Sequence, residues 1–266
     1  MRLLALVLTR SAKLIAALTD RLAHVHIFLS GILPALLPPE QMAWLMRQFY
    51  DHSYEAAGTM IPLEIYPWSL EAWEEQVATD YMTAPGPVLV LGAGLGRESL
   101  ILAERGHRVL GIDLARRGLT IGVCRGQSLT HPPAFVQADF LTLPVRPSSV
   151  GTILVPGVMY SAVPGRTRRQ AWGNALHTCL TPGGRLILNF VIAREPDTTR
   201  AQTTHAVARL LQRLPGSNPD YQSGDTCTNG HFMHVFQTEQ ELREELAGTR
   251  ARIVAIHWSD GFAVLS

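Results

Sequence analysis

Residues 88–97 read Val-Leu-Val-Leu-Gly-Ala-Gly-Leu-Gly-Arg, an apolar run that passes into a glycine-rich turn. Such a short, continuous run is typical of a strand buried on both faces of a parallel sheet. The glycines allow a ligand to approach bare backbone amides at the start of the helical pattern that follows. The stretch therefore predicts a strand, a turn and a helix with a nucleotide-like ligand at the turn, although a turn of this kind can also be purely structural.

Apolar runs and helical patterns alternate after this stretch. We expect further strands at 108–112, 134–137, 151–155 and 185–191, and helices at 97–105, 119–128 and 166–179. Residues 252–258 and 262–265 read as two strands joined by an Asp-Gly step, which is a hairpin signal. We therefore predict an α/β fold with a seven-stranded, mostly parallel Rossmann-like sheet whose last strand is antiparallel.

The residues before the glycine turn do not follow this alternation. Helices interrupted at Pro34, Pro38 and Pro39 are expected there, the second covering 39–54. We assign 1–60 to an N-terminal helical extension or cap, and 61–266 to the main domain, which begins with a helix at 69–82. After a helix at 199–214, residues 215–230 form a loop long enough to serve as a lid.

Composition restricts the classes of partner. The chain has 266 residues, of which 47% are hydrophobic and 17% charged, so it can bury one large core. A net charge of +1 provides no overall field for nucleic acid, and we expect no nucleic-acid partner. The three widely spaced cysteines lack zinc-ligand spacing, which predicts no metal site and a cytoplasmic location.

Two acidic residues stand where predicted strands end. Asp113 closes the second strand and can accept hydrogen bonds from both hydroxyls of a ribose, or cap the next helix. Asp139 and Phe140 follow the third strand, where a carboxylate can accept from an adenine amino group while the ring covers the base. The same sequence is also expected if Asp139 is an aspartate at a strand end with no role in binding.

Taken in order, the glycine loop, Gly111-Ile112-Asp113, Ala138-Asp139-Phe140 and the 180–184 turn Leu-Thr-Pro-Gly-Gly resemble the class I S-adenosylmethionine-dependent methyltransferases over roughly 87–266. The resemblance implies that the loop holds the methionine part of the cofactor, Asp113 the ribose, and Asp139 with Phe140 and Leu114 the adenine. The cofactor residues expected on this basis, with the segment after the fourth strand, are Gly92, Ala93, Gly94, Gly96, Arg97, Asp113, Leu114, Asp139, Phe140, Pro156 and Gly157.

The resemblance has one departure and two rivals. Val90 stands where the family often has an acidic residue, so the amino group of the cofactor needs another partner. An NAD-dependent dehydrogenase would share the turn and the ribose acid, but its fingerprint needs a third glycine where Arg97 stands. A non-catalytic module that binds S-adenosylmethionine stays open.

The acceptor is predicted to be a small molecule methylated on O, N or S. The segment at 156–160 is not the Asn/Asp-Pro-Pro-Tyr motif of enzymes that methylate amino groups of nucleic-acid bases or glutamine. A lipid or quinone-like acceptor at a membrane surface is the second hypothesis, because leucines recur at helical spacing between basic residues near the N-terminus. The N-terminal helix would then make a peripheral membrane contact, whereas the alternative is that it packs on its own domain. Oligomeric state is left open.

A general base is optional for methyl transfer, since positioning supplies much of the acceleration. If a base is used, the candidates are Tyr160, His231, His234 and His52. Residues 230–236 are expected to form one wall of the acceptor pocket, and aromatic residues of the cap the other. These aromatic-wall residues, which could equally anchor the cap, are Phe49, Tyr50, His52, Tyr54 and Trp68.

Overall fold

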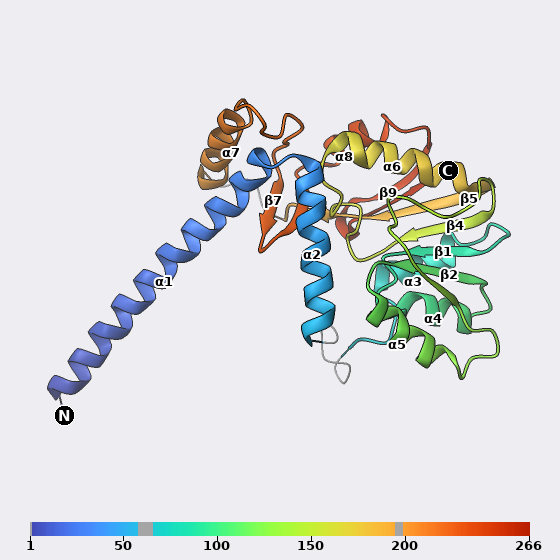
Figure 1. The fold of residues 1–266 in the computed structure, drawn as a ribbon, viewed down its shortest axis with the longest axis horizontal. Coiled ribbons are helices and arrows are strands. Elements are labelled where there is room, and N and C mark those ends of the chain that lie inside the picture. The colour runs from blue at the N-terminus through green and yellow to red at the C-terminus, as the bar shows by residue number, and fades with distance from the viewer. Residues whose placement is uncertain (1, 58–65, 195–198) are drawn as a thin grey trace.

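The computed structural model describes the backbone of residues 2–57, 66–194 and 199–266, and the side chains of 16, 18–50, 66–194 and 201–266. Its main feature is a twisted sheet between two layers of helices (Figure 1). The strands are β1 (Val88–Leu91), β2 (Val109–Asp113), β3 (Ala134–Gln137), β4 (Val150–Val155), β5 (Leu180–Asn189), β9 (Ile253–His257) and β10 (Phe262–Leu265). The helices around it are α3 (Ala72–Asp80), α4 (Arg97–Glu104), α5 (Arg116–Gly126), α6 (Arg166–Cys179) and α8 (Glu239–Leu246).

The strand order of this seven-stranded sheet is β3-β2-β1-β4-β5-β10-β9. Pairing is parallel from β3 to β5, and only β10 runs antiparallel to its two neighbours. The predicted Rossmann-like sheet with an antiparallel last strand is therefore confirmed. In parallel sheets ligands bind beyond the carboxyl ends of the strands, which here places the glycine turn, Asp113 and the segment after β4 along one edge.

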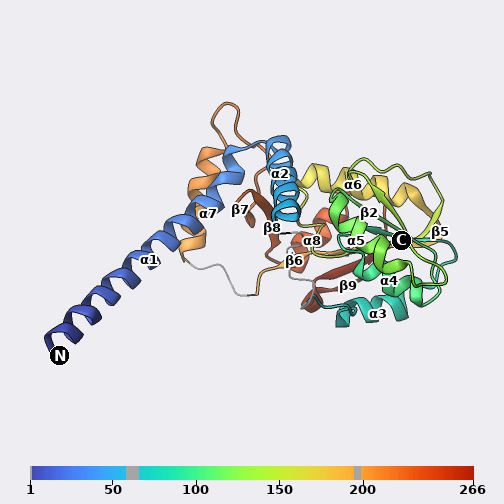
Figure 2. The same cartoon turned by 60° about the horizontal axis from the view of Figure 1, so that its bottom comes forward.

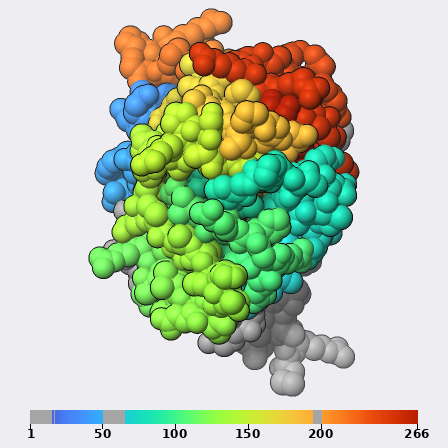
Figure 3. Space-filling model, turned by 90° about the vertical axis from the view of Figure 1, so that its right-hand side faces the viewer, coloured from blue at the N-terminus to red at the C-terminus, as the bar shows by residue number. Residues whose placement is uncertain are grey.

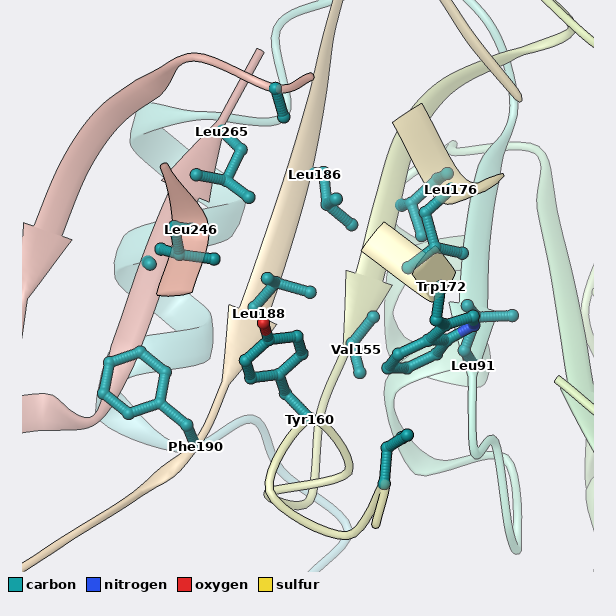
Figure 4. Packing of buried hydrophobic residues seen from close by; sticks show 14 of the residues in the cluster. Leu91, Val155, Tyr160, Trp172, Leu176, Leu186, Leu188, Phe190, Leu246 and Leu265 are labelled. Atoms are coloured by element: carbon teal, nitrogen blue, oxygen red, sulfur yellow. The ribbon is translucent and has the colours of Figure 1, made fainter. Parts of the chain in front are cut away.

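Alternate side chains of β1 enter two different cores. Val88 and Val90 pack with Trp73 of α3 and Leu102 of α4 on one face of the sheet. On the other face, residues of α6 and α8 lie against the sheet, as Figure 4 shows for Trp172, Leu176, Leu246, Leu91, Leu186 and Leu188. Burial on both faces explains why these strands read as continuous apolar runs rather than as alternating ones.

The N-terminal region consists of two helices, α1 (Arg2–Leu36) and α2 (Pro39–Ala57). The predicted interruption at Pro34 was wrong, because α1 continues through that residue and ends before Pro38. Proline cannot donate to the carbonyl of Ser30 one turn earlier. That carbonyl instead accepts a bond from the Thr226 hydroxyl at 3.5 Å, which compensates the lost helical hydrogen bond.

A second sheet, which the sequence patterns did not reveal, joins the N-terminal helices. Its order is β6 (Val191–Ile192), β8 (His231–Phe236) and β7 (Asp225–Thr228). The second sheet continues from the end of β5, where Ile192 and Phe236 pack into the main core, and its outer strand β7 and α7 (Thr199–Leu211) lie beside α1 (Figures 1 and 2). The prediction of one long loop at 215–230 was therefore wrong over 225–228, which pair antiparallel with β8.

When the molecule is viewed from the side on which the main sheet lies, the main sheet and its helices form most of the visible surface, and α2 and α7 appear at its margin (Figure 3). The N-terminal helices thus build a cap together with residues 191–236, rather than alone. Among the described residues, no helix is long and apolar enough to cross a membrane.

Candidate functional site

The glycine turn after β1 has the backbone that its sequence requires. Gly92, Gly94 and Gly96 have φ angles of 75°, 52° and 85°, in the left-handed region that favours glycine. A Cβ at position 92 would lie 2.9 Å from Cγ of Met159, and one at position 96 would lie 2.7 Å from Cζ of Phe135. The turn therefore brings the backbone close to the segment after β4 on one side and to β3 on the other.

Asp113 ties this turn to the end of β2. One carboxylate oxygen accepts from the Gly94 amide and the other from the Ala115 amide, each at 2.7 Å. Burial raises the pKa of Asp113, while the backbone hydrogen bonds act in the opposite direction. Each oxygen of a carboxylate has two lone pairs, so Asp113 retains the capacity to accept from two hydroxyl groups of a ligand.

Asp139 and Phe140 lie beyond β3, where they meet Leu114. One oxygen of Asp139 accepts from the Leu141 amide at 2.9 Å, and the other is 2.6 Å from Nη2 of Arg47 on α2. A small cavity of about 40 Å³ separates α2 from this group. Its lining includes Ala43, Met46, Arg47, Leu114, Asp139 and Phe140. Sequence reasoning did not identify Arg47, whose only signal was its place one helical turn before Tyr50.

Arg97 turns its guanidinium away from this edge, towards α3. Nη2 is 2.6 Å from Oε1 of Glu74 and 2.5 Å from Oε1 of Glu98, and Nη1 donates to the Ser69 carbonyl at 3.0 Å. Burial, with the neighbouring charge of Glu98, raises the pKa of Glu74 to about 7. Because the guanidinium is committed to these groups, the backbone is the part of Arg97 available for a ligand.

The chain reverses sharply after β4. Gly157 has a φ of 61° and Val158 one of 55°, a strained conformation for a β-branched residue. Asn189, at the end of β5, accepts from the Val158 amide at 2.6 Å and donates to the Gly261 carbonyl at 2.9 Å. This bridge fixes the residues after Pro156 beside the glycine turn, as expected for a segment that borders a ligand.

Two of the proposed bases lie inside the core. Tyr160 is fully buried and donates to Glu245 at 2.8 Å, and burial followed by the charge of Glu245 raises its pKa. His234 is also fully buried, with Nδ1 2.7 Å from Asp225 and Nε2 3.5 Å from Glu241. Although burial and Arg169 disfavour its charged form, the hydrogen bond with Asp225 and the nearby carboxylate of Glu241 raise the pKa of His234. Neither side chain reaches a surface that a ligand could touch in this structure.

His231 is placed differently. Its Nε2 lies 2.9 Å from the Tyr50 hydroxyl of α2, and its ring packs 5.0 Å from that of Phe49. The same hydroxyl lies 4.0 Å from Sδ of Met159, the residue packed against Gly92. Burial lowers the pKa of His231, while burial and the charge of Asp113 raise that of Tyr50. The predicted aromatic wall therefore meets the predicted 230–236 wall beside the glycine turn.

The other predicted wall residues are distributed elsewhere. The ring of Trp68 packs at a tilt against that of Tyr66, with 4.8 Å between ring centres, and the Arg125 guanidinium lies 3.6 Å from the centre of the Trp68 ring. The side chains of His52 and Tyr54 lie outside the described residues. Within the described part of the chain, no group of three or more metal-binding side chains is present.

Part of the chain matches a known family model. Residues 89–188 match the family model described as a methyltransferase domain. No curated protein matches the chain.

Several solved structures share the fold. The chain is similar to the Burkholderia thailandensis 1,6-didemethyltoxoflavin-N1-methyltransferase with bound 1,6-didemethyltoxoflavin and S-adenosylhomocysteine (19% identity, 86% of this chain and 89% of that chain, TM-score 0.59). It is also similar to a structure concerned with conversion of a disulfide bond into a thioacetal group during echinomycin biosynthesis (20%, 83% and 90%, 0.54). A third is the [4+2]-cyclase SpnF (16%, 83% and 75%, 0.52). At these identities the likeness establishes the fold.

Proposed function

We propose that this chain, a class I S-adenosylmethionine-dependent methyltransferase with its methyltransferase domain at residues 89–188, methylates an O, N or S atom of a small-molecule acceptor. The observation that carries the proposal is the glycine turn held to Asp113, with Met159 and the Tyr50–His231 pair beside it. Because the [4+2]-cyclase SpnF has the same fold, the fold alone does not define the reaction.

The residues present fit the cofactor. We assign the methionine part to the backbone of 92–97, the ribose to Asp113, and the adenine to the group of Leu114, Asp139 and Phe140. Binding of the adenine requires Asp139 to accept a hydrogen bond from the base, either in place of its ion pair with Arg47 or together with it. Val90 offers no charge to the amino group, so that contact falls to backbone carbonyls or water.

When bound, S-adenosylmethionine supplies a methyl group on a cationic sulfur. That methyl group would pass to a lone pair of the acceptor, with the electron pair of the carbon–sulfur bond left on sulfur. We assign the acceptor's proton to the Tyr50 oxygen, which passes its own proton to Nε2 of His231 across their 2.9 Å contact. His231 ends as imidazolium and returns the proton to water.

A small-molecule acceptor is favoured by the cap. Tyr50 from α2 and His231 from β8 place aromatic groups next to Met159, which packs against the glycine turn, and aromatic groups are the usual lining of a small-ligand site. The toxoflavin methyltransferase, which has this fold, was solved with a small heterocycle bound.

Calorimetry tests the cofactor assignment. We expect wild type to bind S-adenosylhomocysteine and Asp113→Ala to bind it at least about tenfold more weakly, since a hydrogen bond to a charged group contributes about 1.5–3 kcal/mol. Asp220→Ala, an exposed aspartate outside the site, is the matched control and should bind as wild type does. Tight binding of NAD and none of S-adenosylhomocysteine would instead indicate a dehydrogenase.

A second measurement separates an enzyme from a binding module. The protein is incubated with S-adenosylmethionine and a panel of phenols, N-heterocycles and thiols, and formation of S-adenosylhomocysteine is followed. Acceptor-dependent formation supports methyl transfer. Binding of the cofactor with no product across the panel would favour the non-catalytic module.

A further inference from the structure

The part of α1 that extends from the body carries exposed apolar side chains. Leu18, Leu22, Val25, Ile27 and Leu29 are each more than half exposed. Contacts with the body begin at the C-terminal end of the helix, where Ser30 and Ala35 are buried. Figures 1 and 2 show from two sides that α1 projects away from both sheets.

Most of these side chains form a single stripe. Leu18, Leu22, Val25 and Leu29 follow one another at intervals of four, three and four residues, which places them along one face of an α-helix. The same spacing continues in the sequence at Leu4, Val7 and Leu14. Ile27 stands apart, because a residue nine positions after Leu18 lies on the opposite side of the helix.

An uncovered stripe of this kind indicates an interaction surface, because soluble proteins rarely leave contiguous apolar patches exposed to water. The charges of α1 indicate which environment. Its sequence contains Arg2, Arg10, Lys13 and Arg21 against only Asp20, whereas the whole chain has a net charge of +1. Positive charge is therefore concentrated in this helix.

We propose that α1 docks on the surface of an anionic lipid bilayer, with the stripe of Leu18, Leu22, Val25 and Leu29 inserted below the headgroups and Arg10 and Arg21, which lie beside the stripe on the helix, at the lipid phosphates. The helix lies in the plane of the surface. A second copy of the chain is the poorer occupant, because pairing two such helices would bring their positive charges together.

The test is co-sedimentation of the full-length protein with vesicles of phosphatidylcholine containing about one third phosphatidylglycerol, against phosphatidylcholine alone. We expect binding to the anionic vesicles that weakens as salt is raised. Leu22→Glu should lower the vesicle partition coefficient by about tenfold or more, since it places a charge among the acyl chains. Ile27→Glu, with the same charge on the opposite side of the helix, is the matched control and should lower it far less.

Other results would overturn the proposal. Absence of binding to both vesicles, or equal loss in Leu22→Glu and Ile27→Glu, would exclude docking through the stripe. A wild-type dimer that Leu22→Glu converts to a monomer, without vesicle binding, would assign the stripe to a second copy. Far-UV circular dichroism of both variants serves as the folding control, and vesicle binding requires no cofactor, so this test is independent of the proposed methyl transfer.

Discussion

The contact between Tyr50 and His231 joins two residues far apart in the sequence, at 2.9 Å, beside the glycine turn. Burial lowers the pKa of His231 from 6.5, so its imidazole is neutral at pH 7 and able to take a proton. As pH falls through the lowered pKa, the imidazole becomes charged and can no longer accept. We therefore expect kcat/KM for an acceptor that carries a proton to be constant near neutral pH and to fall only below pH 6.5.

Substitutions separate catalysis from binding at this pair. His231→Asn should lower kcat by about 10²–10⁴-fold and remove the acid limb of the pH profile, with the KM for S-adenosylmethionine unchanged. Tyr50→Phe should lower kcat with little effect on folding, because the ring contacts with Phe49 and His231 remain. A raised KM with an unchanged kcat in either variant would mean that the pair positions the acceptor and does not relay its proton.

At the scale of elements, a buried ion pair connects α6, α8 and the loop that precedes β7. Arg169 and Glu245 are fully buried and joined by two bonds of 2.7 Å, and Arg169 also donates to Gln222 at 2.8 Å. Glu245 accepts from Tyr160 as well. Because Arg169 and Glu245 neutralise each other, removal of one side chain leaves the charge of the other buried in a region of low dielectric without a partner.

Glu245→Ala is therefore expected to lower the free energy of unfolding by about 3–5 kcal/mol. Arg243→Ala on the same helix removes an exposed pair with Glu239 and should lower it by less than about 1 kcal/mol. Urea denaturation of the three proteins measures both values. Similar small losses in the two variants would show that water solvates Arg169 when Glu245 is absent.

The elements also show where sequence patterns were sufficient. The helix at 166–179 has the predicted bounds, because its buried apolar residues Trp172, Leu176 and Cys179 recur at helical spacing. The strand at 134–137 also has the predicted bounds, although its residues are mostly exposed. The β7–β8 hairpin was not predicted from the sequence. Its turn nevertheless contains Asn229 and Gly230, with φ angles of 53° and 84°, and an Asn-Gly step is a strong hairpin signal. Their neighbours Asp225, His231 and His234 are polar, so the flanking strands lacked the expected apolar alternation.

In the whole molecule, the site combines parts that local patterns cannot connect. The glycine turn and Asp113 were predictable, because strand, turn and acid follow one another within a short span of chain. Arg47 beside Asp139 and Tyr50 beside His231 were not, since nothing local records that α2 crosses the carboxyl edge of the sheet. Likewise, the predicted division of the chain at residue 60 separates the N-terminal helices from residues 191–236, although the two regions pack together.

This packing predicts how truncation acts. Residues 30–36 hold α1 to the body, since Asn218 bonds the carbonyls of Pro34 and Ala35 at 2.8 and 2.9 Å and Ala35 packs with Ala208 and Tyr221. Removing residues 1–29 should change the free energy of unfolding by less than about 1 kcal/mol, because the side chains described before Ser30 are mostly exposed. Removing residues 1–37 should lower it by about 2–4 kcal/mol through the lost contacts and hydrogen bonds. Urea denaturation of both proteins measures the difference, and equal losses would mean that the projecting part of α1 also packs on the body.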